Sequence, residues 1–244
     1  MRLTVMRGHG KGESVMLRRA VSLIGSGSGC KIRLKHHDVS RVHLALVNTG
    51  EELFVRDLLS KNGTFLNELR AEHEALEDDD VLKVKPWQFR IEVLGPTGTE
   101  LGDYTGLGLD PSPAVVALED TRTGEIVKLP RRVNLIGRRP GCDLVVEDRS
   151  LSRAHALVFT YLSRVVVYDL ASHNGVKLNG EPVKFATLHD GDTLTLGTVD
   201  LKPKIVQPLA KVQPDDNGDG VQAPQPEGSI SDRIDLGSAE LERH

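Results

Sequence analysis

The feature that most constrains this chain is an internal repeat. Shifting the sequence by 112 residues aligns its two halves without a gap over about residues 12–82. Identical residues coincide along this range, in the pairs Gly25/Gly137, Cys30/Cys142, Ser40/Ser152, His43/His155, Asn62/Asn174, Asn67/Asn179 and Asp80/Asp192. Self-similarity at one fixed offset indicates a duplicated unit. We therefore expect two copies of one domain, at residues 1–94 and 113–208 of the 244-residue chain.

The apolar residues of each unit come in short runs, for example at 21–24, 44–47 and 89–93. Runs of this length favour strands over helices. Clusters of glycine, asparagine, aspartate and serine separate the runs at intervals of roughly 8–12 residues, which is the pattern of an antiparallel sandwich. We predict an all-β protein made of two tandem antiparallel β-sandwiches.

Two segments of the chain differ in composition from the predicted units. Residues 95–112 combine glycines and prolines with threonines, which is typical of a flexible linker. Residues 209–244 are polar, acidic and rich in proline and glycine, and such a composition does not supply enough apolar surface to fold alone. We expect a linker at 95–112 and a disordered acidic tail at 209–244, with a weak helical tendency at its end.

Charge and apolar pattern exclude several classes of function. The net charge is −4, whereas a dedicated nucleic-acid binder carries an excess of positive charge. No apolar run reaches the 18 or so residues that span a bilayer, and the first residues lack a secretion signal. The two cysteines, Cys30 and Cys142, are too few for a disulfide framework. We expect a cytoplasmic protein with no nucleic-acid partner, no membrane insertion and no cofactor.

The residues of the second unit form an ordered set of short motifs: Gly137-Arg138, Cys142-Asp143-Leu144, Ser152-Arg153-Ala154-His155, Ser172-His173-Asn174-Gly175, Asn179-Gly180 and Asp190-Gly191-Asp192. This string resembles the forkhead-associated (FHA) domain in motif type, order and spacing. The first unit repeats it with Gly25-Ser26, Ser40-Arg41-Val42-His43, Ser60-Lys61-Asn62-Gly63 and Asn67. The resemblance implies β-sandwiches whose loops at one end bind phosphothreonine in an extended peptide.

The resemblance also implies a role for each matching residue. Phosphothreonine carries about −1.5 to −2 charges at neutral pH, so its site needs a guanidinium, hydroxyls and free N–H groups. By resemblance, the phosphopeptide-binding residues are Arg138, Ser152, Arg153, His173 and Asn174, where Arg138 pairs with the phosphate and Asn174 holds the peptide backbone. The structural residues are Gly25, His43, Gly137, His155 and Gly175. Ordinary turn chemistry also accounts for Ser152 and for the Asn174-Gly175 pair.

The first unit departs from the family pattern at one position, because Ser26 stands where the second unit has Arg138. A charge-assisted hydrogen bond contributes about 1.5–3 kcal/mol, so its loss weakens binding about 10- to 150-fold. A weak site at Ser40, Arg41, Lys61 and Asn62 remains possible if Lys61, Arg41 or Lys35 replaces the missing cation. Otherwise we expect this unit to be a scaffold or a contact surface for another protein or for its sister unit.

Three other motifs carry less chemistry than they suggest. The glycines of 25–29 lack the third glycine of a dinucleotide loop and any Walker lysine. The series Asp215, Asn217, Asp219 imitates half of a calcium loop, but Pro226 stands at position twelve. His36-His37-Asp38 has no fourth ligand at a suitable spacing, so we expect a solvated surface and no metal.

We therefore predict a non-enzymatic tandem FHA protein that binds phosphothreonine mainly through its second unit, on a partner phosphorylated by a Ser/Thr kinase. The alternative is a phosphate-independent scaffold or assembly protein that uses both sandwiches as contact surfaces. Arg149 and Arg139 are candidates for favouring an acidic group beyond the phosphothreonine. The sequence leaves the oligomeric state open.

Overall fold

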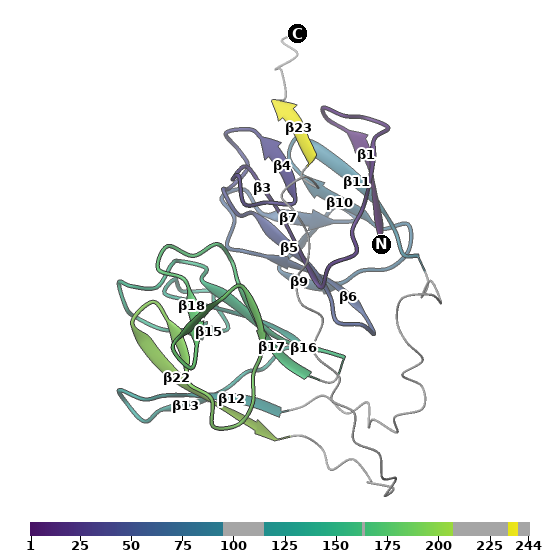
Figure 1. Ribbon diagram of the computed structural model, residues 1–244. Coiled ribbons are helices and arrows are strands. Elements are labelled where there is room, and N and C mark those ends of the chain that lie inside the picture. Colours follow the sequence, from purple (N-terminus) through teal and green to yellow (C-terminus); the bar gives the residue numbers. More distant parts are fainter. Residues whose placement is uncertain (95–114, 163, 207–233, 239–244) are drawn as a thin grey trace, which may run out of the picture.

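The computed structural model describes residues 1–94, 115–162, 164–206 and 234–238, with strands and no helix among them (Figure 1). This agrees with the predicted all-β class. The search for membrane-spanning helices, made over the same residues, found none. The predicted linker at 95–112 lies outside the described residues, as does all of the predicted tail except 234–238.

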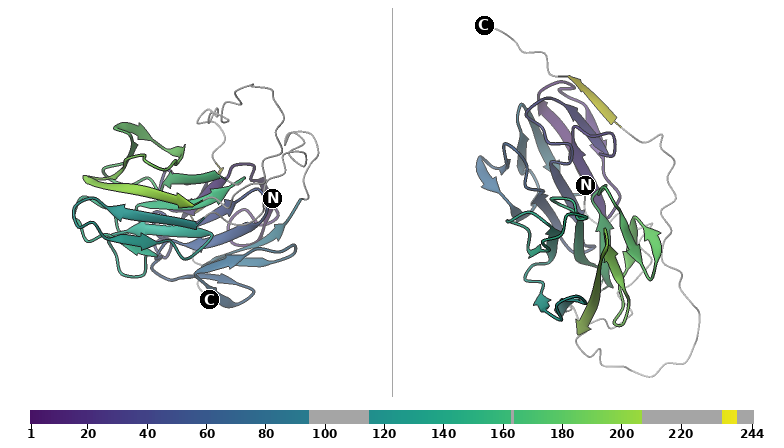
Figure 2. Two further views of the ribbon diagram at one scale, coloured as in Figure 1. Left: turned by 90° about the horizontal axis from the view of Figure 1, so that it is seen from below. Right: turned by 90° about the vertical axis from the view of Figure 1, so that its left-hand side faces the viewer.

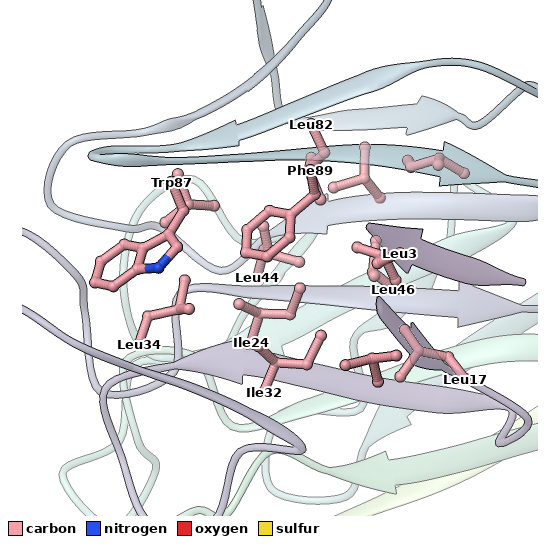
Figure 3. Packing of buried hydrophobic residues seen from close by; sticks show 14 of the residues in the cluster. Leu3, Leu17, Ile24, Ile32, Leu34, Leu44, Leu46, Leu82, Trp87 and Phe89 are labelled. Atoms are coloured by element: carbon pink, nitrogen blue, oxygen red, sulfur yellow. The ribbon is translucent and has the colours of Figure 1, made fainter. Parts of the chain in front are cut away.

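The first unit is a sandwich of two sheets, with strand orders β2-β1-β11-β10-β7-β8 and β4-β3-β5-β6-β9. Its strands are β1 (Arg2–Arg7), β2 (Ser14–Met16), β3 (Val21–Gly25), β4 (Ile32–Lys35), β5 (Leu44–Asn48), β6 (Leu53–Asp57), β7 (Thr64–Leu66), β8 (Leu69–Ala71), β9 (His73–Ala75), β10 (Val81–Val84) and β11 (Trp87–Glu92). Alternate side chains of these strands fill the space between the sheets, where Trp87 and Phe89 pack on Ile24, Leu34 and Leu44 (Figure 3).

The second unit repeats this architecture with sheets of order β13-β12-β22-β21-β18-β19 and β15-β14-β16-β17-β20. Its strands are β12 (Val115–Asp120), β13 (Ile126–Lys128), β14 (Val133–Gly137), β15 (Leu144–Val145), β16 (Ala156–Tyr161), β17 (Arg164–Asp169), β18 (Val176–Leu178), β19 (Glu181–Val183), β20 (Phe185–Thr187), β21 (Leu194–Leu196) and β22 (Val199–Val206). Within both units the described pairs are antiparallel, except that β3–β4 and β14–β15 are parallel. The two sandwiches of the prediction are therefore confirmed.

The two units pack against each other through one sheet each (Figure 2). Strands β3, β5 and β6 face β14, β16 and β17, and their outward side chains form a third buried apolar cluster. We call this contact the seam. Its buried residues are Val21, Leu23, Cys30, Ala45, Val47, Phe54 and Leu58 from the first unit, and Val133, Leu135, Leu157, Phe159, Val166 and Leu170 from the second.

The seam uses the same positions of both units. Val21 and Val133 are 112 residues apart, as are Leu23 and Leu135, and Leu58 and Leu170. A contact in which each half offers the same patch is the kind found in two-fold symmetric dimers. The first unit therefore does contact its sister unit, which is one of the roles that the sequence predicted for it.

A strand also lies within the predicted tail. Strand β23 (Ile234–Ser238) pairs in parallel with β4, where Ile234 is opposite Ile32 and Asp235 is opposite Arg33 (Figure 1). The sequence analysis predicted disorder here. An unpaired sheet edge offers free backbone groups to an extended segment, and the edge strand β4 provides such a template.

Candidate functional site

The loop after β14 is joined by backbone hydrogen bonds to the loop that carries Ser152. The N–H of Arg138 donates to the carbonyl oxygen of Ser152 at 3.1 Å, and the N–H of Arg139 donates to that of Arg153 at 3.3 Å. A Cβ at Gly137 would lie 2.2 Å from the Arg153 carbonyl oxygen. Glycine is thus required at position 137 because the two backbones approach too closely for any side chain.

His155 joins the Ser152 loop to the loop after β17. Its ring is fully buried, its Nδ1 accepts the N–H of Ser152 at 2.9 Å, and its Nε2 lies 3.0 Å from the carbonyl oxygen of Gly175. The neutral ring with its proton on Nε2 satisfies both partners. Burial lowers the pKa of His155, which keeps the ring neutral. The structure places His155 as an internal brace between the loops.

The loop after β17 is held by two further side chains. Asp169 accepts the N–H and the hydroxyl of Ser172 at 3.0 and 2.6 Å. Asn174 donates from Nδ2 to the carbonyl oxygen of Ser150 at 2.8 Å. Asp169 was not singled out from the sequence, although its counterpart Asp57 at the same offset was a usable signal.

These contacts bring the predicted binding residues together at one end of the second sandwich, which we call the second rim. Its exposed side chains are Arg138, Arg153, His173 and Asn174, around the half-buried Ser152. Among the described residues, the Ser152 hydroxyl oxygen accepts one hydrogen bond, from His173 N–H at 3.0 Å, so its own proton is left for an external acceptor. Cationic groups beside hydroxyl and N–H donors suit an anion.

The first unit keeps the same loop framework, which we call the first rim. The N–H of Ser26 donates to the Ser40 carbonyl oxygen at 2.9 Å, and a Cβ at Gly25 would lie 2.5 Å from the Arg41 carbonyl oxygen. His43 is buried, with its Nδ1 accepting Ser40 N–H at 3.1 Å, and burial lowers its pKa. The loops of both units are thus built alike.

The first rim differs in its charged groups. Ser26 donates its hydroxyl to the Val39 carbonyl oxygen at 3.0 Å, while Arg41 and Lys61 are exposed. The N–H of Lys61 donates to Ser40 Oγ at 3.0 Å, as His173 does to Ser152. Arg33 of β4, which the sequence analysis did not single out, donates from Nε to the Ser26 carbonyl oxygen at 3.1 Å.

The remaining predicted first-rim residue, Asn62, holds its loop as Asn174 does. Its Nδ2 donates to the backbone carbonyl oxygen of Asp38 at 2.9 Å and to the Asp38 carboxylate at 3.1 Å. Gly63 and Gly175, which follow the two asparagines, adopt the left-handed conformation with φ of 78° and 77°. This conformation explains glycine at both positions.

The segment of His36, His37 and Asp38 is less solvated than the sequence suggested. The His36 side chain is only 10% exposed and meets Trp87 edge-on, with ring centroids 6.0 Å apart. Potential ligand atoms of the three residues lie within 4.8 Å of one another. However, His36 Nδ1 already accepts the N–H of Asp38 at 3.2 Å, so this nitrogen serves the local turn.

The seam itself was missed by the sequence analysis. All five residues of β3 and all five of β14 are buried, because their two faces pack against different partners. An antiparallel sheet with one wet face alternates apolar and polar residues, whereas burial on both faces gives continuous apolar runs. The uninterrupted runs at 21–24 and 44–47 were the signal for this contact.

The model of the FHA domain family matches residues 22–85 and 134–197, together just over half of the chain. The chain therefore belongs to the FHA domain family and contains two copies of the domain.

Three comparisons with known proteins agree with this assignment. The glycogen accumulation regulator GarA of Mycobacterium tuberculosis is 30% identical over 108 residues, which is 44% of this chain and 67% of GarA. The ABC transporter ATP-binding/permease protein Rv1747 of the same organism is 36% identical over 106 residues, 43% of this chain and 12% of that protein. A structure solved in an analysis of phosphothreonine-dependent FHA domain interactions is 30% identical, covers 39% of this chain and 99% of its own, and has a TM-score of 0.36.

Proposed function

We propose that this protein is a non-enzymatic adaptor that binds phosphothreonine-containing partners, mainly through its second FHA domain. The observation that carries the proposal is the exposed Arg138 beside the Ser152 hydroxyl, in a unit whose sister has Ser26 at the equivalent position. The partner would be a protein phosphorylated by a Ser/Thr kinase, and the proposed location is the cytoplasm. The proposed domain bounds are 1–94 and 113–208.

Charge and geometry support a phosphate at the second rim. The planar guanidinium of Arg138 meets two phosphate oxygens at once, which a lysine does not. The Ser152 hydroxyl and the N–H of Arg153 add donors, and His173 lies on the same loop as Asn174. Asn174 would hold the peptide backbone, which fixes its direction. Because His155 and Asp169 already brace these loops, little of the binding free energy is spent on ordering them.

The first FHA domain would bind phosphothreonine weakly in this proposal. Its loop framework is intact, but Ser26 turns its hydroxyl to the Val39 carbonyl oxygen and supplies no positive charge. The loss of one charge-assisted contact costs about 1.5–3 kcal/mol. We propose that this domain mainly supports the second one through the seam.

A phosphate-independent scaffold is the second candidate, and the apolar seam favours it because it shows that these sandwiches form contacts through their sheet faces. The two candidates differ in what they predict for phosphate. An adaptor loses its partner on dephosphorylation or on loss of Arg138, whereas a scaffold keeps it.

The test is a degenerate phosphothreonine peptide library, with phosphoserine and unphosphorylated versions, screened against the full chain. The Arg138→Ala and Ser152→Ala variants should lose binding about 10-fold or more. Arg164→Ala is the matched control, since Arg164 is an exposed arginine at the start of β17 and Asp169, at its other end, adjoins the rim. Binding that does not require phosphate, or that survives Arg138→Ala, would support the scaffold instead.

A further inference from the structure

The two rims meet at one end of the seam. A Cβ at Gly141, in the second rim, would lie 3.0 Å from Leu59 Cδ2 of the first unit. A Cβ at Gly29, in the first rim, would lie 3.7 Å from Ala171 Cβ of the second unit. Each loop after β3 or β14 therefore touches the sister unit's loop after β17 or β6.

These two contacts are the same contact made twice, because Gly29 and Gly141 are 112 residues apart and so are Leu59 and Ala171. The far end of the seam is closed by different residues, where Leu162 N–H donates to the Thr49 carbonyl oxygen at 2.9 Å. Both rims thus lie at the same end of the tandem, on either side of one junction.

One side chain of the second unit crosses this junction. Arg139 donates from Nη1 to the carbonyl oxygen of Leu59 at 3.2 Å. Leu59 lies two residues before Lys61, whose N–H donates to Ser40 Oγ. The first unit has Gly27 at the position of Arg139, so the crossing is made in one direction only. The first rim, which lacks its own arginine, therefore has a guanidinium from its neighbour.

The charges around the junction are mostly positive. Exposed cationic side chains are Arg41 and Lys61 on the first rim, and Arg138, Arg139 and Arg153 on the second. The acidic side chains on the same loops are engaged locally. Asp38 accepts from Asn62 at 3.1 Å, and Asp148 pairs with Arg122 at 2.9 Å.

We propose that the two rims form one composite site for a peptide that carries two phosphorylated residues. The proposal rests on the proposed function, in which the first phosphate occupies the Arg138 pocket. The second phosphate would cross the junction and take Arg139, Lys61 and the Ser40 hydroxyl. A second bound group on the same chain binds at a high effective concentration when its spacer matches the span, so even a weak second site raises affinity substantially.

The experiment measures the dissociation constants of the full chain for matched peptides by fluorescence anisotropy. One peptide carries a single phosphothreonine, and the others add a second phosphothreonine, or a glutamate, at spacings from three to twelve residues. We expect one range of spacings at which the doubly phosphorylated peptide binds at least about tenfold more tightly than the single one. In Arg139→Gln and Lys61→Gln this ratio should fall toward two, while Arg164→Gln keeps the wild-type ratio.

The outcomes separate this proposal from the proposed function. If the single phosphopeptide binds through Arg138 but the ratio stays near two at every spacing, the composite site is overturned and the adaptor stands. A ratio that survives both Arg139→Gln and Lys61→Gln overturns it as well, and so does a glutamate peptide that matches the second phosphate. If no phosphopeptide binds, both proposals fail.

Discussion

Arg56 of the first sandwich and Asp143 of the second form an ion pair across the seam, with Arg56 Nη2 2.6 Å from Asp143 Oδ2. Their side chains are 4% and 6% exposed. Asp143 also accepts the N–H of Leu135 at 2.7 Å and is paired with Arg131 at 2.8 Å. Buried charges are costly unless they are paired and hydrogen-bonded, so this pair depends on both units being docked.

Asp143→Asn should lower the free energy of unfolding by about 3 kcal/mol, because it leaves the buried Arg56 without its counter-charge. Urea denaturation of the full chain measures this. The control is Asp79→Asn, whose partner Arg90 is 3.8 Å away with both side chains more than half exposed, and which should cost less than about 1 kcal/mol. Equal losses in the two variants would show that the pair does not stabilise the seam.

Stability should fall in mild acid because of buried histidines near the seam and the rims. Burial, with help from Arg56 and Arg131, lowers the pKa of His73 to about 4 from a usual 6.5. Between these values the unfolded chain binds a proton that the folded chain does not, so the free energy of unfolding decreases as pH falls from 6.5 to 4. The burial of His43 and His155 acts in the same direction.

Urea titrations at pH 7 and pH 5 test this dependence. One histidine contributes at most about 1.4 kcal/mol per pH unit, and solvent screening at the half-buried His73 ring reduces its share. His73→Gln should show a smaller loss at pH 5 than the wild type, whereas His37→Gln, at a ring 69% exposed, should behave like the wild type. The same pH dependence in His73→Gln would remove His73 as a cause.

Ser26→Arg should give the first domain a phosphothreonine site. The loop framework around Ser26 is that of Arg138, so the new guanidinium should raise the affinity of this domain about 10- to 100-fold. Calorimetric titration of the Arg138→Ala background isolates the first domain. Ser28→Arg, two residues further along the same loop, is the control, and an equal gain there would mean that net charge alone is responsible.

Gly137→Ala should disrupt the second rim, because its Cβ would overlap the Arg153 carbonyl oxygen at 2.2 Å. Overpacking of this kind costs about 1–3 kcal/mol. We expect weaker phosphopeptide binding together with a lower melting temperature. Gly29→Ala, whose nearest contact is an ordinary 3.7 Å, should change the melting temperature much less. Comparable losses in both would contradict the steric account of Gly137.

Sequence reasoning reached the sandwiches and the loops because both depend on local signals. Short apolar runs indicated the strands, and the repeated Ser40 and Ser152 motifs marked loops that the structure builds alike. The assignment of binding to Arg138 remains a prediction. The framework around it, from Gly137 to His155, is now explained by close backbone contacts and internal hydrogen bonds.

The seam could not be read from those local signals. Arg56 and Asp143 are 87 residues apart, and the repeat replaces them by Tyr168 and Lys31, so no motif connects the pair. The parallel pairing of β23 with β4 likewise depends on a sheet edge far away in the sequence. Contacts between distant segments depend on how the units dock, which periodicity within one strand does not report.

The most direct test of the central claim is the number of phosphothreonine peptides that one chain binds. Calorimetric titration of the full chain with a singly phosphorylated peptide chosen from the library should give one peptide per chain at the strong site. The Arg138→Ala variant should lose this site, while Arg164→Ala should keep it. Two equivalent sites per chain, or one site that persists without Arg138, would contradict the assignment of binding to the second domain.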